Sequence, residues 1–177
     1  MSITLRDSRD TDIDGISAIY QHAVGTGTAS FELDPPSVTE MARRRDAVVG
    51  NGFPYLVAEY DGQIAGYAYA STYRARPGYR FTVENSVYVA TTQQGRGIGK
   101  VLLTELVRRC EADHYRLIVA IIGDSDSKAS IALHAACGFV DAGVLPGVGW
   151  KFGRWLDSVL MVRPLGADQS TPAPDGR

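Results

Sequence analysis

A glycine-rich loop in the middle of the chain has the residue types of a phosphate site. It lies between an expected strand and an amphipathic helix, where unpaired backbone N–H groups and the helix dipole favour an anion. Its glycines let the backbone approach a pyrophosphate closely, but the spacing fits neither a nucleotide triphosphatase nor a dinucleotide-binding fold. A turn that only caps the helix is the alternative. The loop residues are Gln94, Gly95, Arg96, Gly97, Ile98, Gly99 and Lys100.

Four other side chains have types and positions that suit chemistry on an amine. Glu84 is a carboxylate in an otherwise apolar strand, which is costly unless it faces a polar cleft, so it suits a general base. An ion pair with Arg74 or Arg76 is the structural alternative. These two arginines suit a carboxylate or phosphinate ligand, or are simply solvated. His134, in the last turn of a short helix, is either catalytic or bound to terminal carbonyls.

The elements that must position these residues follow from hydrophobic periodicity and turn signals. Asp61-Gly62 predicts a tight hairpin turn, and Gly138 a left-handed helix end. Strand 81–90 alternates, with Val83 and Val87 on one face and Glu84 on the other. The expected order is strand 3–5, helix from 13 to Gly25 or Gly27, helix 37–49, strands 55–60, 64–70 and 81–90, helix 97–113, strand 117–122, helix 126–137, and strands 139–145 and 156–162.

Composition bounds the class of protein. A chain of 177 residues predicts one catalytic domain, residues 1–165, and the polar composition of residues 166–177 predicts a disordered tail. The net charge of −2 provides no global field for nucleic acid or an anionic membrane. Cys110 and Cys137 fit neither a disulfide framework nor a metal site, so we expect buried thiols and no metal. No targeting or membrane-spanning segment is evident, which favours a cytoplasmic protein.

The loop pattern Gln94-x-x-Gly97-x-Gly99 resembles the acetyl-CoA signature of the GCN5-related N-acetyltransferase (GNAT) superfamily, and the element order matches that fold. The resemblance extends from Ile3 to about Arg163. Within the superfamily it is strongest to phosphinothricin and methionine sulfoximine N-acetyltransferases. It rests on the segments 83–89 (VENSVYV), 129–134 (ASIALH) and 149–157 (GWKFGRWLD).

The resemblance implies an α/β (α+β) fold with a mixed, mostly antiparallel sheet of six to seven strands and about four helices. It implies acetyl-CoA as acetyl donor and direct attack by an amine, with Glu84 as base and His134 in the active site. Tyr88 either protonates the departing thiolate or packs over the cofactor. Many superfamily members instead use a tyrosine where this chain has Phe139, so the acid stays open.

The resemblance also implies how the two substrates are held. A bulge near Ser86 frees the N–H groups of Val87 and Val89 for pantetheine and the thioester carbonyl. Near the start of the short helix, where the family carries an asparagine that contacts CoA, Ser127 is the implied substitute as hydrogen-bond partner, with Ser130 nearby. The acceptor residues implied are Phe31, Arg74, Arg76 and Tyr79. The residues Trp150, Lys151 and Trp155 line either the pocket or a homodimer interface.

The sequence therefore predicts an enzyme that N-acetylates a small amino acid analogue such as phosphinothricin, methionine sulfoximine or methionine sulfone. Two alternatives remain. A protein or peptide N-acetyltransferase needs an open groove, whereas an arginine-bearing loop favours a small carboxylate. A non-catalytic acyl-CoA sensor retains the cofactor loop but does not need Glu84.

Overall fold

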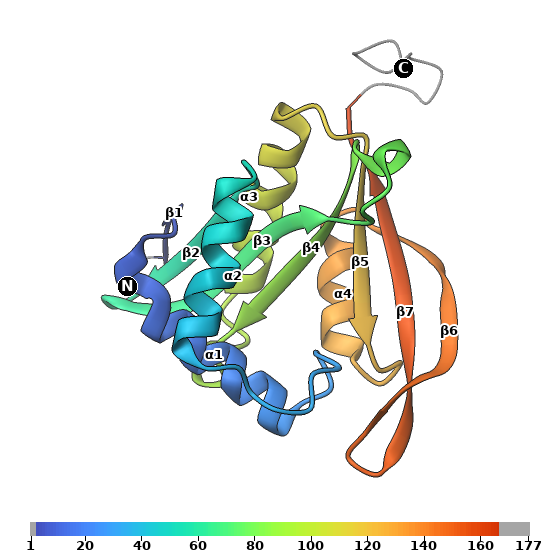
Figure 1. Ribbon diagram of the computed structural model, residues 1–177, viewed down its shortest axis with the longest axis horizontal. Coiled ribbons are helices and arrows are strands. Elements are labelled where there is room, and N and C mark those ends of the chain that lie inside the picture. Colours follow the sequence, from blue (N-terminus) through green and yellow to red (C-terminus); the bar gives the residue numbers. More distant parts are fainter. Residues whose placement is uncertain (1–2, 167–177) are drawn as a thin grey trace.

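The computed structural model describes residues 3–166, in which seven strands form one sheet with two helices on each face (Figure 1). The predicted order of elements and the α+β class are confirmed. The elements are β1 (Ile3–Asp7), α1 (Ile13–Thr26), α2 (Val38–Gly50), β2 (Tyr55–Tyr60), β3 (Gln63–Thr72), β4 (Thr82–Val89), α3 (Ile98–Ala112), β5 (Leu117–Gly123), α4 (Lys128–Ala136), β6 (Val140–Lys151) and β7 (Arg154–Pro164).

The sheet has the order β1-β2-β3-β4-β5-β7-β6, and only β4 and β5 run parallel. Their pairing joins Thr82–Asn85 to Leu117–Ala120 and then stops. On the other side, β4 stays paired with β3 as far as Val89. The two parallel strands therefore diverge from Ser86 onward, and the sheet opens between them.

The bulge expected near Ser86 is wrong. The β3–β4 register runs without a shift from Val83 to Val89, so no extra residue is inserted. The opening arises because β5 leaves β4, while β4 itself stays regular. The strand still directs N–H groups into the opening: Ala90 N donates to Ala65 O at 2.9 Å, and N–H directions alternate along a strand. The N–H groups of Val87 and Val89 therefore point toward the side that β5 has left.

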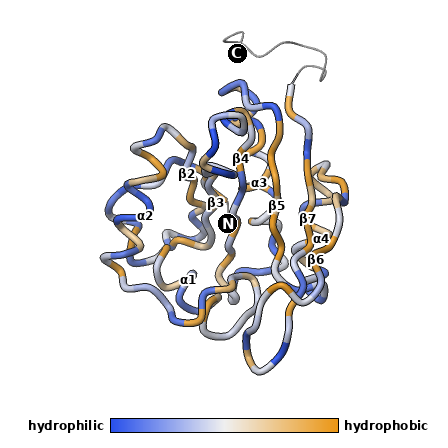
Figure 2. Tube along the Cα trace, turned by 45° about the vertical axis from the view of Figure 1, so that its right-hand side comes forward, coloured by the Kyte–Doolittle hydropathy of each residue, from blue (hydrophilic) through white to orange (hydrophobic). Residues whose placement is uncertain are grey.

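Two hydrophobic clusters lie on opposite faces of the sheet. The α3 stripe of Ile98, Leu102, Leu106 and Cys110 packs with Leu56 on one face. The other cluster joins α1 and α2 to alternate residues of β2 and β3, namely Ile16, Ile19, Tyr20, Val24, Met41, Tyr55, Val57 and Tyr67. Figure 2 shows the hydrophobic character of β5 and of the middle of β7, and the more hydrophilic α2. The strand alternation predicted from the sequence thus builds both faces.

Several local expectations are confirmed and others corrected. Asp61 and Gly62 have φ of 51° and 77°, as the tight turn requires, and Cys110 and Cys137 are free and buried. The last two strands are longer than the predicted 139–145 and 156–162. They extend to a tight turn at residues 152–153. Strand β5 is mostly buried, but Ile121 is 40% exposed beside the opening. The predicted disordered tail, apart from Gly166, lies outside the described residues.

Candidate active site

The glycine-rich loop and the start of α3 form one end of a cavity of about 590 Å³. Gly95 and Gly97 have φ of 76° and 81°, which favours glycine at both positions. Gly97 precedes α3 without a side-chain cap, and the first backbone bond of the helix joins Val101 N to Gly97 O. The N–H groups of Ile98 to Lys100 are consequently unpaired by the helix, and no acidic residue lies in its first turn. These groups fit a pyrophosphate.

The structure brings the predicted cofactor residues to this cavity, with one exception. The Arg96 guanidinium turns to Tyr60, donating to its hydroxyl at 3.3 Å and stacking over its ring, and it does not line the cavity. The predicted residues that do line it are Val87, Tyr88, Val89, Gln94, Gly95, Gly97, Ile98, Gly99, Lys100, Ser127 and Ser130. Residues of α1 and of the following loop, including Ile19 and Thr28, were not predicted but form the opposite wall.

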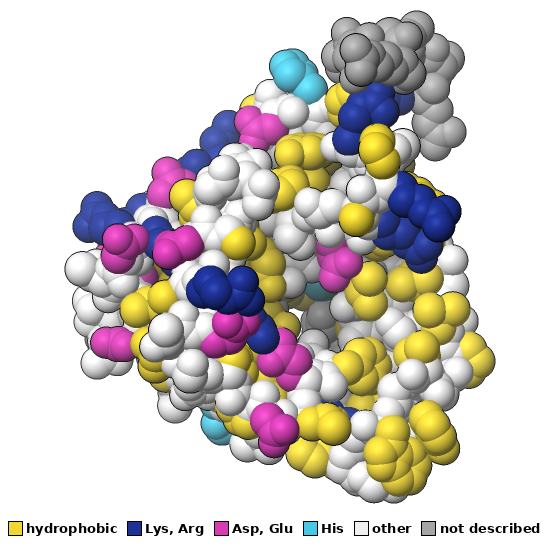
Figure 3. Space-filling model, in the orientation of Figure 1, with side chains coloured by type: hydrophobic (Ala, Val, Ile, Leu, Met, Phe, Trp, Pro, Cys, Tyr) yellow, Lys and Arg dark blue, Asp and Glu magenta, His cyan; other side chains and the backbone are white. Residues whose placement is uncertain are grey.

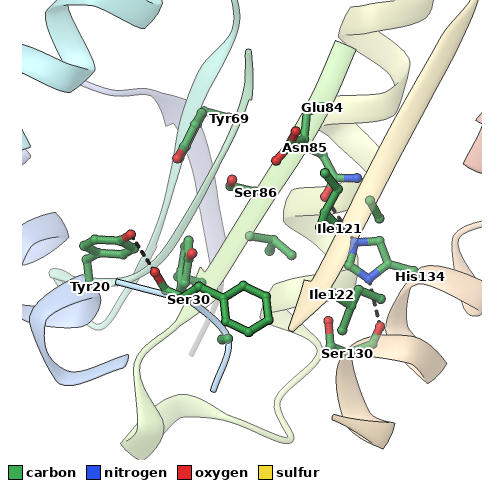
Figure 4. Close-up of a pocket in the computed structure, with 15 residues that line it drawn as sticks. Tyr20, Ser30, Tyr69, Glu84, Asn85, Ser86, Ile121, Ile122, Ser130 and His134 are labelled. Carbon is green, nitrogen blue, oxygen red and sulfur yellow. Dashed lines mark hydrogen bonds between the residues drawn. The ribbon is translucent and has the colours of Figure 1, made fainter. Parts of the chain in front are cut away.

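A second cavity of about 270 Å³ lies where β4 and β5 diverge. Figure 3 shows the molecule hollowed at this place, and Figure 4 shows the side chains that point into the hollow. Ala29, Val87, Tyr88 and Ser130 line both cavities, so the two adjoin. A ligand in the larger cavity and one in the smaller cavity would meet beside the free N–H groups of β4.

Glu84 lines the smaller cavity, on the β4 face that carries Ser86 and Tyr88 (Figure 4). Its neighbours in the sheet are Ser71 of β3 and Val119 of β5, so its backbone is held on both sides. Burial raises the pKa of the Glu84 carboxyl above its usual value. A fixed carboxylate with a raised pKa is suited to accept a proton from a nearby ammonium group.

Three tyrosines also line the cavity, and two of them, Tyr20 and Tyr69, were not predicted as site residues. Tyr69 lines it opposite Ser86 in the sheet, and burial raises the pKa of its phenol. Tyr20 lines it from α1, and its hydroxyl lies 3.0 Å from Ser30 Oγ. Tyr88 packs edge-on against Tyr20, with ring centroids 5.1 Å apart, and burial raises the Tyr88 pKa strongly. Tyr88 therefore keeps its proton at neutral pH.

His134 is buried, and both of its ring nitrogens face oxygen atoms. Nδ1 lies 2.8 Å from the carbonyl oxygen of Ser130, and Nε2 lies 3.1 Å from Oδ1 of Asn85 (Figure 4). Asn85 Nδ2 in turn donates to Val119 O at 3.3 Å. Donation to both oxygens requires the protonated ring, whereas burial lowers the His134 pKa and favours the neutral ring. The contacts to Ser130 and Asn85 tie α4 to the divergence of β4 and β5.

The four predicted acceptor residues occupy two places. Phe31 lines the smaller cavity. Arg74, Arg76 and Tyr79 do not line it: they are exposed on the loop between β3 and β4, where the Arg74 guanidinium lies 5.8 Å from the Tyr79 ring centroid. The sequence correctly placed these residues beside the catalytic strand, because the loop re-enters the sheet two residues before Glu84. Sequence spacing could not show whether their side chains reach the cavity.

The fold and this site define the class of the protein. Residues 16–139 match the model of the acetyltransferase (GNAT) family, and the chain belongs to that family. It is an acetyl-CoA-dependent N-acetyltransferase, and its sheet with two helices on each face is the GNAT fold.

Individual relatives match nearly the whole chain. A phosphinothricin N-acetyltransferase of Alcaligenes faecalis is 56% identical over 95% of this chain and 85% of the relative. An L-methionine sulfoximine/L-methionine sulfone acetyltransferase of Pseudomonas paraeruginosa is 42% identical over 97% of this chain and all of the relative. The crystal structure of a phosphinothricin acetyltransferase from Sinorhizobium meliloti in complex with acetyl-CoA has a TM-score of 0.95 and 46% identity, covering 99% and 95% of the two chains.

Residues 3–166 offer no metal-binding cluster and no membrane-spanning helix. They contain no group of three or more His, Cys, Asp or Glu side chains that could hold a metal ion. No helix in the same residues is long and apolar enough to cross a membrane.

Proposed function

We propose that this enzyme acetylates the free amine of a small amino acid analogue, of the type of phosphinothricin, methionine sulfoximine or methionine sulfone. The observation that carries the proposal is the 270 Å³ cavity, which holds Glu84 and joins the cofactor cavity at Val87 and Tyr88. Its volume suits an amino acid. The names of the Alcaligenes and Pseudomonas relatives support the same substrate class.

The larger cavity is proposed to hold acetyl-CoA, which supplies an activated acetyl thioester when bound. The unpaired N–H groups at the start of α3 bind its pyrophosphate, and those of Val87 and Val89 bind pantetheine and polarise the thioester carbonyl. Ser127 and Ser130 line the same cavity from the start of α4. All of these contacts come from backbone groups or short side chains on rigid elements.

The proposed chemistry is direct transfer of the acetyl group. Glu84 takes a proton from the acceptor ammonium, and the freed nitrogen attacks the thioester carbonyl carbon. The C–S bond breaks as the amide C–N bond forms, Tyr88 gives its proton to the departing sulfur, and the excess proton on the new amide nitrogen passes back to the Tyr88 oxygen. Tyr88 suits this role because it lines both cavities and keeps its proton at neutral pH. His134 holds Asn85 and α4 in place beside the reacting atoms.

Phe31 is proposed to pack against the acceptor side chain, and Arg74, Arg76 and Tyr79 to act at the mouth of the cavity. A carboxylate or phosphinate there would meet two guanidinium groups. Replacing Arg76 by alanine tests this part alone. If Arg76→Ala binds the acceptor as tightly as wild type does, then Arg76 does not contribute to acceptor binding.

A thiol-release assay with acetyl-CoA tests the function. The panel contains free amino acids, phosphinothricin, methionine sulfoximine, methionine sulfone and short peptides. We expect turnover of at least one free analogue and none of the peptides, because the cavity is small and walled by residues 29–31. Turnover of peptides alone would overturn the substrate class and favour a peptide N-acetyltransferase.

We further propose that the catalytic domain, residues 1–165, works as a cytoplasmic homodimer. Edge strand β6 and its partner β7 expose a broad apolar surface, visible at the lower right of Figure 3. Its exposed members are Val144, Leu145, Val148, Trp150, Phe152 and Trp155. Surfaces of this kind favour protein contacts. Light scattering should give twice the chain mass, and Trp155→Glu should reduce it; a monomeric wild type would refute the dimer.

A further inference from the structure

A short strap of residues 27–31, directly after α1, forms the wall between the two cavities. Thr28 lines only the cofactor cavity, Phe31 lines only the smaller cavity, and Ala29 lines both. Figure 1 shows this connection reaching from α1 toward the far strands of the sheet. The position of the strap therefore controls the shape of the acceptor space.

The end of the β6–β7 hairpin holds the strap through three contacts. Lys151 Nζ donates to the carbonyl oxygen of Ser30 at 2.8 Å, and the two residues are 121 positions apart. Arg154 pairs with Asp124, whose carboxylate lies beside Thr28. The third contact is steric and involves Phe31.

The ring of Phe31 lies directly against Gly149. A Cβ atom built on Gly149 would stand 2.4 Å from Cε1 and 2.5 Å from Cδ1 of Phe31, closer than such atoms approach. The φ of Gly149 is not in the left-handed region, so a side chain there is excluded by the ring alone. Glycine at this position lets the aromatic side chain reach the cavity wall.

Lys151 is only 2% exposed, although ammonium groups are costly to bury. Burial lowers its pKa, and the attraction of Glu32 opposes that effect. An apolar side chain of similar length would pack there without the cost of desolvation. The ammonium group instead makes a hydrogen bond to Ser30, whose hydroxyl also contacts Tyr20 of the cavity wall.

The geometry points to Gly149 and Lys151 as positioning residues that hold Phe31 and Ser30 in the wall and thereby set acceptor binding. Neither residue lines either cavity, so both act through the strap. This inference rests on the proposed function, because it takes the smaller cavity as the acceptor site.

The test compares Gly149→Ala and Lys151→Met with wild type, using acetyl-CoA and the best acceptor of the panel. Displacing a wall residue by about 1 Å should raise the acceptor KM roughly tenfold or more. The acetyl-CoA KM should stay within about twofold, because Thr28 lies beside Asp124 and outside the contacts that the two substitutions remove. Gly50→Ala, at a glycine with no atom within 4 Å, is the matched control and should change neither KM.

Two further measurements separate positioning from general destabilisation. Combining Gly149→Ala with Phe31→Ala should add nothing to the acceptor KM of Phe31→Ala alone, because the ring through which Gly149 acts is gone. Hydrogen exchange of the amides in residues 27–31 should be faster in both single variants, whichever acceptor is used.

The outcomes are distinct. An unchanged acceptor KM in folded Gly149→Ala protein, or equal rises in both KM values, would overturn the inference. Wild-type rates of amide hydrogen exchange at residues 27–31 in both variants would also overturn it. If wild type turns over none of the free analogues, the proposed function fails, and the exchange measurement still decides whether the hairpin holds the strap.

Discussion

Replacing Glu84 by glutamine removes the proposed base while keeping the size of the side chain. Glu84 is held in the sheet by Ser71 on one side and Val119 on the other, so the amide should occupy the place of the carboxylate. A positioned general base contributes about 10²- to 10⁴-fold to rate, equivalent to roughly 3–5 kcal/mol of barrier. We expect kcat of Glu84→Gln to fall within that range, with the acetyl-CoA KM unchanged.

The pH profile gives a second signature of the same residue. Burial raises the Glu84 pKa above the usual carboxyl value, so wild-type activity should rise with pH through that raised pKa. Glutamine does not titrate, and this acid limb should disappear from the profile of the variant. The residual pH dependence should then follow the amine of the acceptor alone.

The stability of the variant should change in the opposite direction to its activity. A carboxyl whose pKa is raised by folding binds its proton more tightly in the folded state, so wild type loses stability as pH rises through that pKa. Above that pKa the ionised Glu84 destabilises the fold, and glutamine removes this cost. We expect the melting temperature of Glu84→Gln to equal or exceed that of wild type.

Thermal denaturation and the thiol-release assay, run on the same preparations, check both expectations. A variant that retains wild-type kcat would refute the base assignment. A variant that loses activity together with a large drop in melting temperature would show that Glu84 supports the fold and not the reaction.

Three other replacements have defined outcomes. Gly97→Ala should lower the free energy of unfolding by about 1–2 kcal/mol, because alanine is strained in the left-handed region, whereas Gly50→Ala in α2 should not; chemical denaturation measures both. Tyr88→Phe should reduce kcat about tenfold or more with little change in either KM if its hydroxyl protonates the thiolate; an unchanged kcat would exclude it. Asn85→Leu removes an acceptor from His134 and should lower the His134 pKa further, as NMR titration would show; a raised pKa would contradict the contact.

Local chemistry explains why much of the fold could be predicted. The hairpin at Asp61-Gly62 and the α3 stripe depend on residues close in sequence, and both were correct. The cofactor loop was placed for the same reason, since its glycines and the helix they precede are contiguous. Of the loop residues, only Arg96 does not line the cofactor cavity. Its side chain binds Tyr60 of β2, a contact that sequence spacing does not reveal.

The features that were missed depend on contacts between distant segments. The divergence of β4 from β5 needs no bulge, and no residue near Ser86 signals it. The sequence pattern around Tyr20 and Tyr69 indicates only that they pack in the core. Their place in the cavity lining depends on how the strands assemble. The packing of Phe31 on Gly149 joins residues more than a hundred positions apart, beyond the range of periodicity or turn rules.

The short seam between β4 and β5 has a consequence for the mechanics of the whole molecule. Four paired residues on each strand, Thr82–Asn85 and Leu117–Ala120, are the only strand pairing between the half of the sheet formed by β1–β4 and the half formed by β5–β7 within residues 3–166. A ligand bound in the opening between β4 and β5 contacts both halves of the sheet and links them. Saturation with acetyl-CoA should therefore slow amide exchange on strands it never contacts, by making the two halves open as one unit.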